Sequence, residues 1–158
     1  MKENVEQTAR GFEQPVHCQF SIFLANRLGQ LKELLDVFLD REIRVLGFSV
    51  VDSTDWAVVR VVVSDPDKAR EVLKRERLPF TESEVLLVEL AGENDVSLVC
   101  GLLLQAEVAI HFAYPLTVRR DDHPLMAFHV DDHLLAAKIL VHHGLGLIGY
   151  DDLDDPGL

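Results

Sequence analysis

The sequence predicts an α+β fold built from two similar halves. The apolar pattern of residues 20–45 recurs without a gap at residues 85–110, an offset of 65. A second stretch, residues 59–73, recurs at an offset of 67. Each half also reads as strand, helix, strand, strand, helix, strand. A repeat of this length is too long for a solenoid unit, so it indicates a small domain that has been duplicated.

The matched positions are apolar in both copies, although the residues are seldom identical. The pairs include Phe20 with Val85, Ile22 with Leu87, Leu34 with Val99, Phe38 with Leu103, Val61 with Phe128, and Leu73 with Leu140. The change of offset falls within one turn, where insertions are tolerated.

The first copy is expected over residues 15–84. Alternating apolar residues indicate strands, and apolar residues spaced three or four apart indicate helices. In order, these are a strand at 17–24, a helix at 31–39, strands at 43–51 and 56–63, a helix at 65–77 and a strand at 80–84.

The second copy is expected over residues 85–153, between a flexible N-terminal segment at 1–14 and an acidic tail at 154–158. Its second helix is capped by Asp131 and ends at Gly144. In order, its elements are a strand at 85–90, a helix at 95–105, a strand at 108–118, a longer turn at 119–124, a strand at 125–130, a helix at 132–143 and a strand at 147–150.

This order, with right-handed crossovers, gives an antiparallel four-stranded sheet with both helices on one face. The sequence therefore predicts two tandem ferredoxin-like βαββαβ units. Each unit alone is close to the size at which a domain is only marginally stable. We therefore expect the copies to pack on each other or on a partner, and a homodimer is the expected assembly.

Composition excludes several classes of function. The net charge is −12, from 27 acidic and 15 basic residues, which disfavours nucleic acid and anionic membranes as partners. The two cysteines, Cys18 and Cys100, indicate neither a disulfide framework nor a zinc site. Because no signal-peptide pattern opens the chain, we expect a cytoplasmic protein.

Catalytic and metal-binding motifs are also missing. There is no Gly-x-Ser-x-Gly elbow and no phosphate-binding glycine loop. His129 and His133 are four residues apart, but a strand–helix boundary between them argues against a shared metal. We expect no metal, no cofactor and no enzyme activity. The alternative of a small enzyme would need an acid and a base that converge in a pocket.

The most informative local signal is the segment Leu-Ala-Asn-Arg-Leu-Gly-Gln-Leu at residues 24–31. A polar residue ends the strand and a glycine enters the helix, so free backbone N–H groups at the helix start suit a carboxylate. The alternative is that Gly29 only permits a tight turn.

This segment, with the amphipathic helix and the Glu-Ile-Arg-Val that follow, resembles the start of an ACT domain. Val108-Ala109-Ile110 echoes the second strand, and Tyr150-Asp151-Asp152-Leu153 resembles the common ending. The resemblance covers about residues 16–153 as two copies. It implies a regulatory module that binds an amino acid and modulates an enzyme of amino-acid metabolism. The chain is also similar to the small regulatory subunits of acetolactate synthase, although no motif carries that narrower likeness.

The resemblance also implies the site residues. In the family, ligand lies between the first strand–helix loop of one copy and the second strand of its neighbour. The implied residues are Asn26, Arg27, Leu28, Gly29, Gln30 and Leu31, with His111 and Tyr114 on the facing strand. Leu28 stands where proline is common in the family.

The second loop departs from the first. It consists of Gly92, Glu93, Asn94 and Asp95, with Asn94 at the place of Gly29. Asn tolerates left-handed backbone angles, but Glu93 and Asp95 would repel a carboxylate. We expect the first loop to bind and the second to be weak or structural. The alternative for the whole chain is a dimerisation or scaffold module that binds no ligand.

Overall fold

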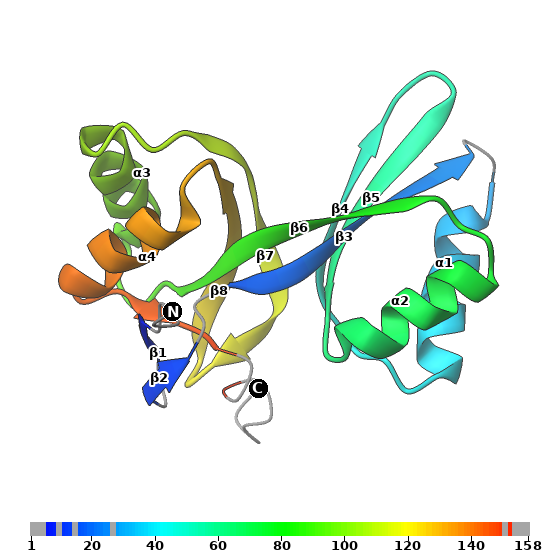
Figure 1. Cartoon of the computed structure of the whole chain (residues 1–158), viewed down its shortest axis with the longest axis horizontal. Helices are drawn as coiled ribbons and strands as arrows, with labels where there is room; N and C mark the ends of the chain where they lie inside the picture. The colour runs from blue at the N-terminus through cyan, green and yellow to red at the C-terminus, as the bar shows by residue number, and fades with distance from the viewer. Residues whose placement is uncertain (1–5, 9–10, 14–15, 26–27, 150–151, 153–158) are drawn as a thin grey trace, which may run out of the picture. The chain divides into compact units, whose positions relative to one another are not determined.

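The computed structural model describes residues 6–8, 11–13, 16–25, 28–149 and 152. The chain divides into two compact units (Figure 1). The first unit is Cys18–Ser83, and the second unit is Met1–His17 together with Glu84–Leu158. Each has its own hydrophobic core.

The first unit has the expected βαββαβ order. Its strands pair antiparallel: β5 lies between β3 and β4, which leaves β4 at the edge. Its core joins Phe20 and Ile22 of β3 with Leu34 and Phe38 of α1 and Leu73 of α2. The elements are β3 (His17–Ala25), α1 (Gln30–Asp40), β4 (Val45–Asp52), β5 (Trp56–Val63), α2 (Pro66–Arg75) and the start of β6 (Phe80–Glu89).

The second unit repeats this order, which confirms the predicted fold class. Strand β8 pairs antiparallel with β6 and β7, and β9 pairs with β6. Its core draws on both helices and on the strand face that carries Leu86 and Phe128. The elements are the end of β6, α3 (Asp95–Gln105), β7 (Ile110–Arg120), β8 (His123–Val130), α4 (His133–His142) and β9 (Gly146–Leu147).

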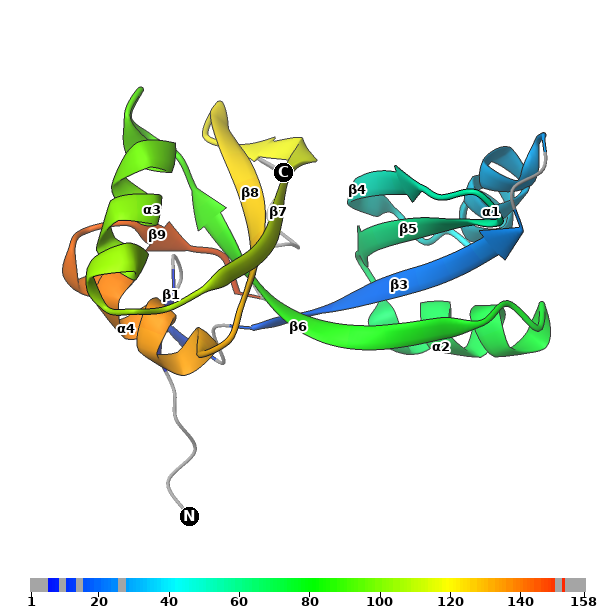
Figure 2. The same cartoon turned by 90° about the horizontal axis from the view of Figure 1, so that it is seen from above.

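Strand β6 joins the two repeats without a break, where the sequence predicts two strands at 80–84 and 85–90. The prediction of two strands is wrong, because β6 is continuous over Phe80–Glu89 (Figure 2). No glycine or proline interrupts the segment, so nothing in it turns the backbone.

The gapless alignment at an offset of 65 is wrong for this strand. In β3, Phe20 and Ile22 face the first core, but their structural partners in the second core are Leu86 and Val88 rather than Val85 and Leu87. The run Val-Leu-Leu-Val at 85–88 is apolar at every position. It therefore has no alternation from which the buried face can be read.

The helices keep the offset of 65, because Leu34 and Val99, and likewise Phe38 and Leu103, occupy matching core positions. The strand-side core positions follow an offset of 66, since Leu90, directly after β6, takes the core place of Leu24. The spacing from there to the first buried residue of the helix is therefore one residue shorter in the second unit, from Leu90 to Val99 rather than from Leu24 to Leu34.

The N-terminal segment, expected to be irregular and flexible, contains two short strands. Strands β1 (Glu6–Thr8) and β2 (Gly11–Glu13) form an antiparallel ladder in which Gln7 pairs with Phe12. Three-residue strands are too short to show a period in the sequence, and their backbone groups pair whatever the side chains are.

The turn between β7 and β8 is shorter than the expected 119–124. Arg120 pairs with His123, so only Asp121 and Asp122 form the turn, with φ of 46° and 64°. Two-residue hairpin turns require positive φ, and Asp tolerates it better than most residues.

The capping residue of α4 also differs from the expectation. Asp132, not Asp131, caps the helix, because its Oδ1 accepts a hydrogen bond from the Leu135 N–H at 3.0 Å. Asp131 instead accepts one from the Ala109 N–H at 3.0 Å. Gly144 ends the helix as predicted, with φ of 80°.

Among the described residues, none of the helices is both long enough and apolar enough to cross a membrane. The apolar stretch 96–116 contributes to α3 and then to β7.

Candidate functional site

The turn that enters α1 has the geometry that its glycine predicts. Gly29 has φ of 89°, a left-handed conformation that favours glycine. Its carbonyl accepts the first helical hydrogen bond from the Glu33 N–H at 3.0 Å, and among the described residues no side chain caps the helix. The first N–H groups of a helix have no carbonyl partner within the helix, and its dipole makes this end positive.

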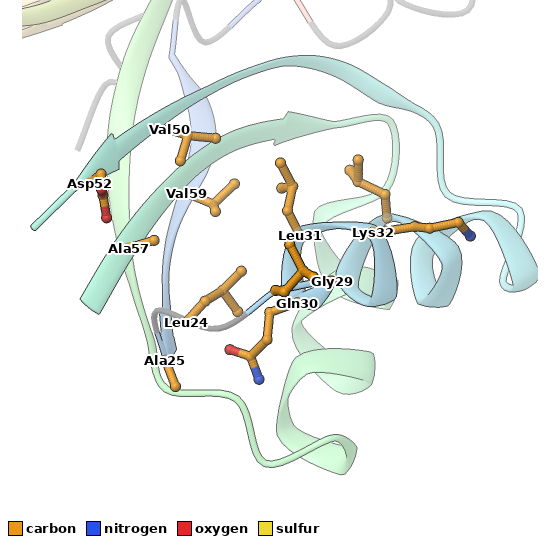
Figure 3. Close-up of a pocket in the computed structure, with 12 residues that line it drawn as sticks. Leu24, Ala25, Gly29, Gln30, Leu31, Lys32, Val50, Asp52, Ala57 and Val59 are labelled. Carbon is orange, nitrogen blue, oxygen red and sulfur yellow. The ribbon is translucent and has the colours of Figure 1, made fainter. Parts of the chain in front are cut away.

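An open pocket of about 620 Å³ lies beside this turn, within the first unit (Figure 3). It is formed by the end of β3, the first half of α1, the end of β4 and the start of β5. Its lining residues are Leu24, Ala25, Leu28, Gly29, Gln30, Leu31, Lys32, Leu35, Val50, Asp52, Ala57 and Val59.

The pocket walls are mainly aliphatic. Leu31 and Leu35 are one turn apart on α1 and lie on the same helix face. Val50 of the edge strand β4 pairs with Val59 of β5, so both side chains project from the same face of the sheet. Val50 is 44% exposed, while Val59 is buried. Apolar surface therefore faces solvent beside the helix start.

Three of the described side chains that line the pocket are polar. Asp52 ends β4 opposite Ala57 and is exposed. The Lys32 ammonium is paired with Asp36 at 2.5 Å, and this hydrogen bond raises the pKa of Lys32. The Oε1 atom of Gln30 is buried and has no hydrogen-bond partner among the described residues. Asp52 and Gln30 therefore present acceptors.

The structure brings four of the six predicted first-loop residues to this pocket. Leu28, Gly29, Gln30 and Leu31 all line it. Asn26 and Arg27 lie outside the described residues.

His111 and Tyr114, the predicted facing residues, belong to the second unit, where both lie on β7. The ring of His111 lies 5.4 Å from that of His129, and Tyr114 is buried and stacks on Phe112. Their role in binding stays a prediction.

The prediction from the sequence missed eight of the twelve described lining residues. The contribution of β4 and β5 depends on strand register, which pairs Val50 with Val59 and Asp52 with Ala57. Periodicity does not specify which strands are neighbours. The one available signal was that Asp52 begins a polar cluster at a strand end.

In the second loop, the Asp95 side chain occupies a backbone N–H group of the turn. The Gly92 N–H donates a hydrogen bond to Oδ2 of Asp95 at 2.9 Å. A Cβ atom at Gly92 would lie 2.8 Å from Oδ1 of the same carboxylate. The expectation that Asn94 reproduces the left-handed turn of Gly29 is wrong, because Asn94 has φ of −103°.

The histidines singled out by the sequence contact acidic residues of the second unit. His133 Nε2 lies 2.8 Å from Oε2 of Glu84, and His129 Nδ1 lies 2.9 Å from the Glu84 carbonyl oxygen. His123 Nδ1 lies 2.6 Å from Glu89 Oε1. Within the described part of the chain, no three His, Cys, Asp or Glu side chains are placed to hold a metal.

The comparison with family models agrees with the resemblance to ACT domains. The family model of the ACT domain pair matches residues 16–155. No curated protein matches this sequence.

Solved structures share the fold. Protein BT0572 from Bacteroides thetaiotaomicron has 23% identity and a TM-score of 0.80, with 96% of this chain and 98% of that chain covered. The ligand-free regulatory subunit of aspartate kinase from Thermus thermophilus has 13% identity and a TM-score of 0.58, over 83% and 93%. A structure of aspartokinase alpha and beta subunits has 12% identity and a TM-score of 0.50, over 82% and 96%.

Proposed function

We propose, because the chain belongs to the family of ACT domain pairs, that it is a regulatory module which binds an amino acid at the Gly29 turn. The observation that carries the proposal is the pocket itself, which opens in the first unit beside a helix start that no described side chain caps. Such a module is a binding protein rather than an enzyme.

Each part of an amino acid has a counterpart in this pocket. The N–H groups at the start of α1 and the positive end of its dipole suit the α-carboxylate. The Asp52 carboxylate, at the opposite side of the lining, suits the α-ammonium group. The aliphatic walls then suit the side chain. Asn26 and Arg27, which precede the turn, are proposed as further contacts.

The second loop is proposed to be structural. The Asp95 carboxylate already holds the Gly92 N–H, and Glu93 adds a second negative charge near a site that would have to accept a carboxylate. Gly92, Glu93, Asn94 and Asp95 therefore form at most a weaker site.

The partner is proposed to be an enzyme of amino-acid metabolism. Two of the similar structures are named for aspartate kinase, one of them as its regulatory subunit. Acetolactate synthase is the narrower hypothesis from the sequence resemblance. Allostery requires that the partner and the amino acid change each other's affinity by the same factor, so both titrations test it.

Calorimetry of the full chain against the twenty standard amino acids tests the binding. Saturable heat from at least one of them is expected, and Gly29→Asp should remove it by placing a carboxylate at the helix start. Gly144→Asp is the matched control, because Gly144 has φ of 80° and open space around it, as Gly29 does, but ends α4.

Two results would contradict the proposal. Absence of binding by every amino acid, with a partner captured independently of any amino acid, favours a scaffold module. Equal loss of binding in Gly29→Asp and Gly144→Asp would place the effect in stability rather than in the site.

A cytoplasmic homodimer is proposed as the assembly. The edge strand β4 exposes Phe48, Val50 and Val51, and exposed apolar edges invite pairing with another chain. Light scattering should then give twice the chain mass of 17.8 kDa, and a mass of one chain would overturn the dimer.

A further inference from the structure

The part of the pocket that is proposed to hold the ligand's side chain is lined by aliphatic residues. Leu31 and Leu35 of α1 face Val50 and Val59 of the sheet, and Figure 3 shows Leu31, Val50 and Val59 gathered between the helix and the strands. These side chains offer dispersion contacts and no hydrogen bond. A polar group of a ligand that entered this part would lose its water without a replacement partner.

The charges at the pocket disfavour an acidic side chain. Lys32 is the cation among the described lining residues, but its ammonium is paired with Asp36 at 2.5 Å, and Figure 3 shows its side chain pointing away along α1. Asp52 adds a negative charge to the lining. Among the described lining residues, a second carboxylate on the ligand would therefore meet the negative charge of Asp52 and no cation that lacks a carboxylate partner. Arg27, proposed above as a further contact, precedes the turn that is proposed to take the α-carboxylate.

A basic side chain is disfavoured for a different reason. Asp52 is the carboxylate of the lining, and the α-ammonium group of any amino acid already needs an anionic partner. A second cation would compete for Asp52 or lie unpaired against the aliphatic wall, where loss of hydration is costly.

We infer that the ligand is an α-amino acid with an uncharged aliphatic side chain, which packs between Leu31 and Leu35 on one side and Val50 and Val59 on the other. This inference rests on the proposed function, since it assumes that the pocket at Gly29 binds an amino acid.

Calorimetry of the full chain with L-leucine, L-isoleucine, L-valine, L-alanine, L-aspartate and L-lysine tests the class. At least one of the three branched amino acids should bind about tenfold or more tightly than alanine, aspartate and lysine, because each added methylene in an apolar pocket is worth roughly this factor. Tightest binding of aspartate or lysine overturns the inference but leaves the proposed function standing. No binding by any of the twenty standard amino acids overturns both.

Two neighbouring valines of β4 provide a matched pair of variants. Val50 and Val51 are 44% and 47% exposed, but Val50 pairs with the pocket residue Val59, whereas Val51 pairs with Val58 on the opposite face of the sheet. Both variants add one charge to the same edge strand, so an effect on pairing between chains is common to the two, but only Val50 lines the pocket. Val50→Asp should therefore weaken binding of the best branched amino acid by about tenfold or more relative to Val51→Asp. Equal affinities of the two variants, with circular dichroism spectra like the wild type, would overturn the placement of the side chain.

Discussion

The Asp95 carboxylate accepts a hydrogen bond from the Gly92 N–H at 2.9 Å, and this contact distinguishes the two repeats. Asp95 is the first residue of α3, and Gln30 is the first residue of α1. The second repeat therefore places a carboxylate of its own at the strand–helix turn, whereas residues 26–30 of the first repeat contain no carboxylate.

Gln30→Asp should make the first loop resemble the second, because it places a carboxylate at the first residue of the helix, as Asp95 does in α3. A carboxylate at the first helical position competes with the ligand carboxylate, so amino-acid affinity should fall about tenfold or more, or roughly 1.4 kcal/mol. Thermal stability should stay level or rise, because an acidic residue favours a helix N-terminus. Calorimetry with Gln30→Asn as the amide control measures the effect. Unchanged affinity in Gln30→Asp would contradict the proposal that the ligand's α-carboxylate binds at this turn.

The fold could be predicted from local patterns where those patterns are unambiguous. Helix α3 has the predicted bounds of 95–105 because apolar and turn residues mark both of its ends. The strand phase at Val85 could not be predicted, since neighbouring residues are all apolar and burial on both faces removes the alternation. Sequence patterns describe one element at a time, so their errors fall where two elements must be compared.

The site was predictable only on its helix side. Gly29 and its neighbours are consecutive in sequence, and a positive φ at glycine before a helix is a local property. Val50, Asp52 and Val59 reach the same pocket through strand pairing, which depends on long-range packing.

Two glycines should respond oppositely to alanine. Gly29→Ala should destabilise the protein by about 1 kcal/mol or more, because Gly29 has φ of 89° and a Cβ is strained there. Gly101→Ala should stabilise it by about 0.5 to 1 kcal/mol, because Gly101 lies inside α3 and, apart from its chain neighbours and the backbone of its own helix, no described atom lies within 4 Å of an added Cβ. Urea unfolding measures both. Destabilisation of equal size in the two variants would contradict this reading of the Gly29 backbone.

The two thiols should differ in reactivity. Burial, followed by the hydrogen bond to Glu82, raises the pKa of Cys18 to about 12, whereas Cys100 is exposed. Because the thiolate is the reactive form, an aromatic disulfide reagent near about pH 8 should modify one thiol per chain quickly and the other only on unfolding. Cys100→Ser should remove the fast reaction, and a fast reaction that persists in Cys100→Ser would contradict the protection of Cys18.

His17 should make the free energy of unfolding depend on pH in the acidic range. Its imidazole is buried, which lowers its pKa from 6.5 to about 4, and Nε2 lies 2.7 Å from the Ile148 carbonyl oxygen. The folded state favours the neutral imidazole. The contribution of His17 to the free energy of unfolding is therefore complete above 6.5, the pKa of the unfolded chain, and is lost as the pH falls from 6.5 towards 4. Between about pH 7.5 and about pH 4.5, the wild type should lose about 2 to 3 kcal/mol more unfolding free energy than His17→Gln, which keeps a donor but does not titrate. Parallel urea titrations of both proteins measure this difference, and equal losses would mean that His17 is protonated without cost in the folded state.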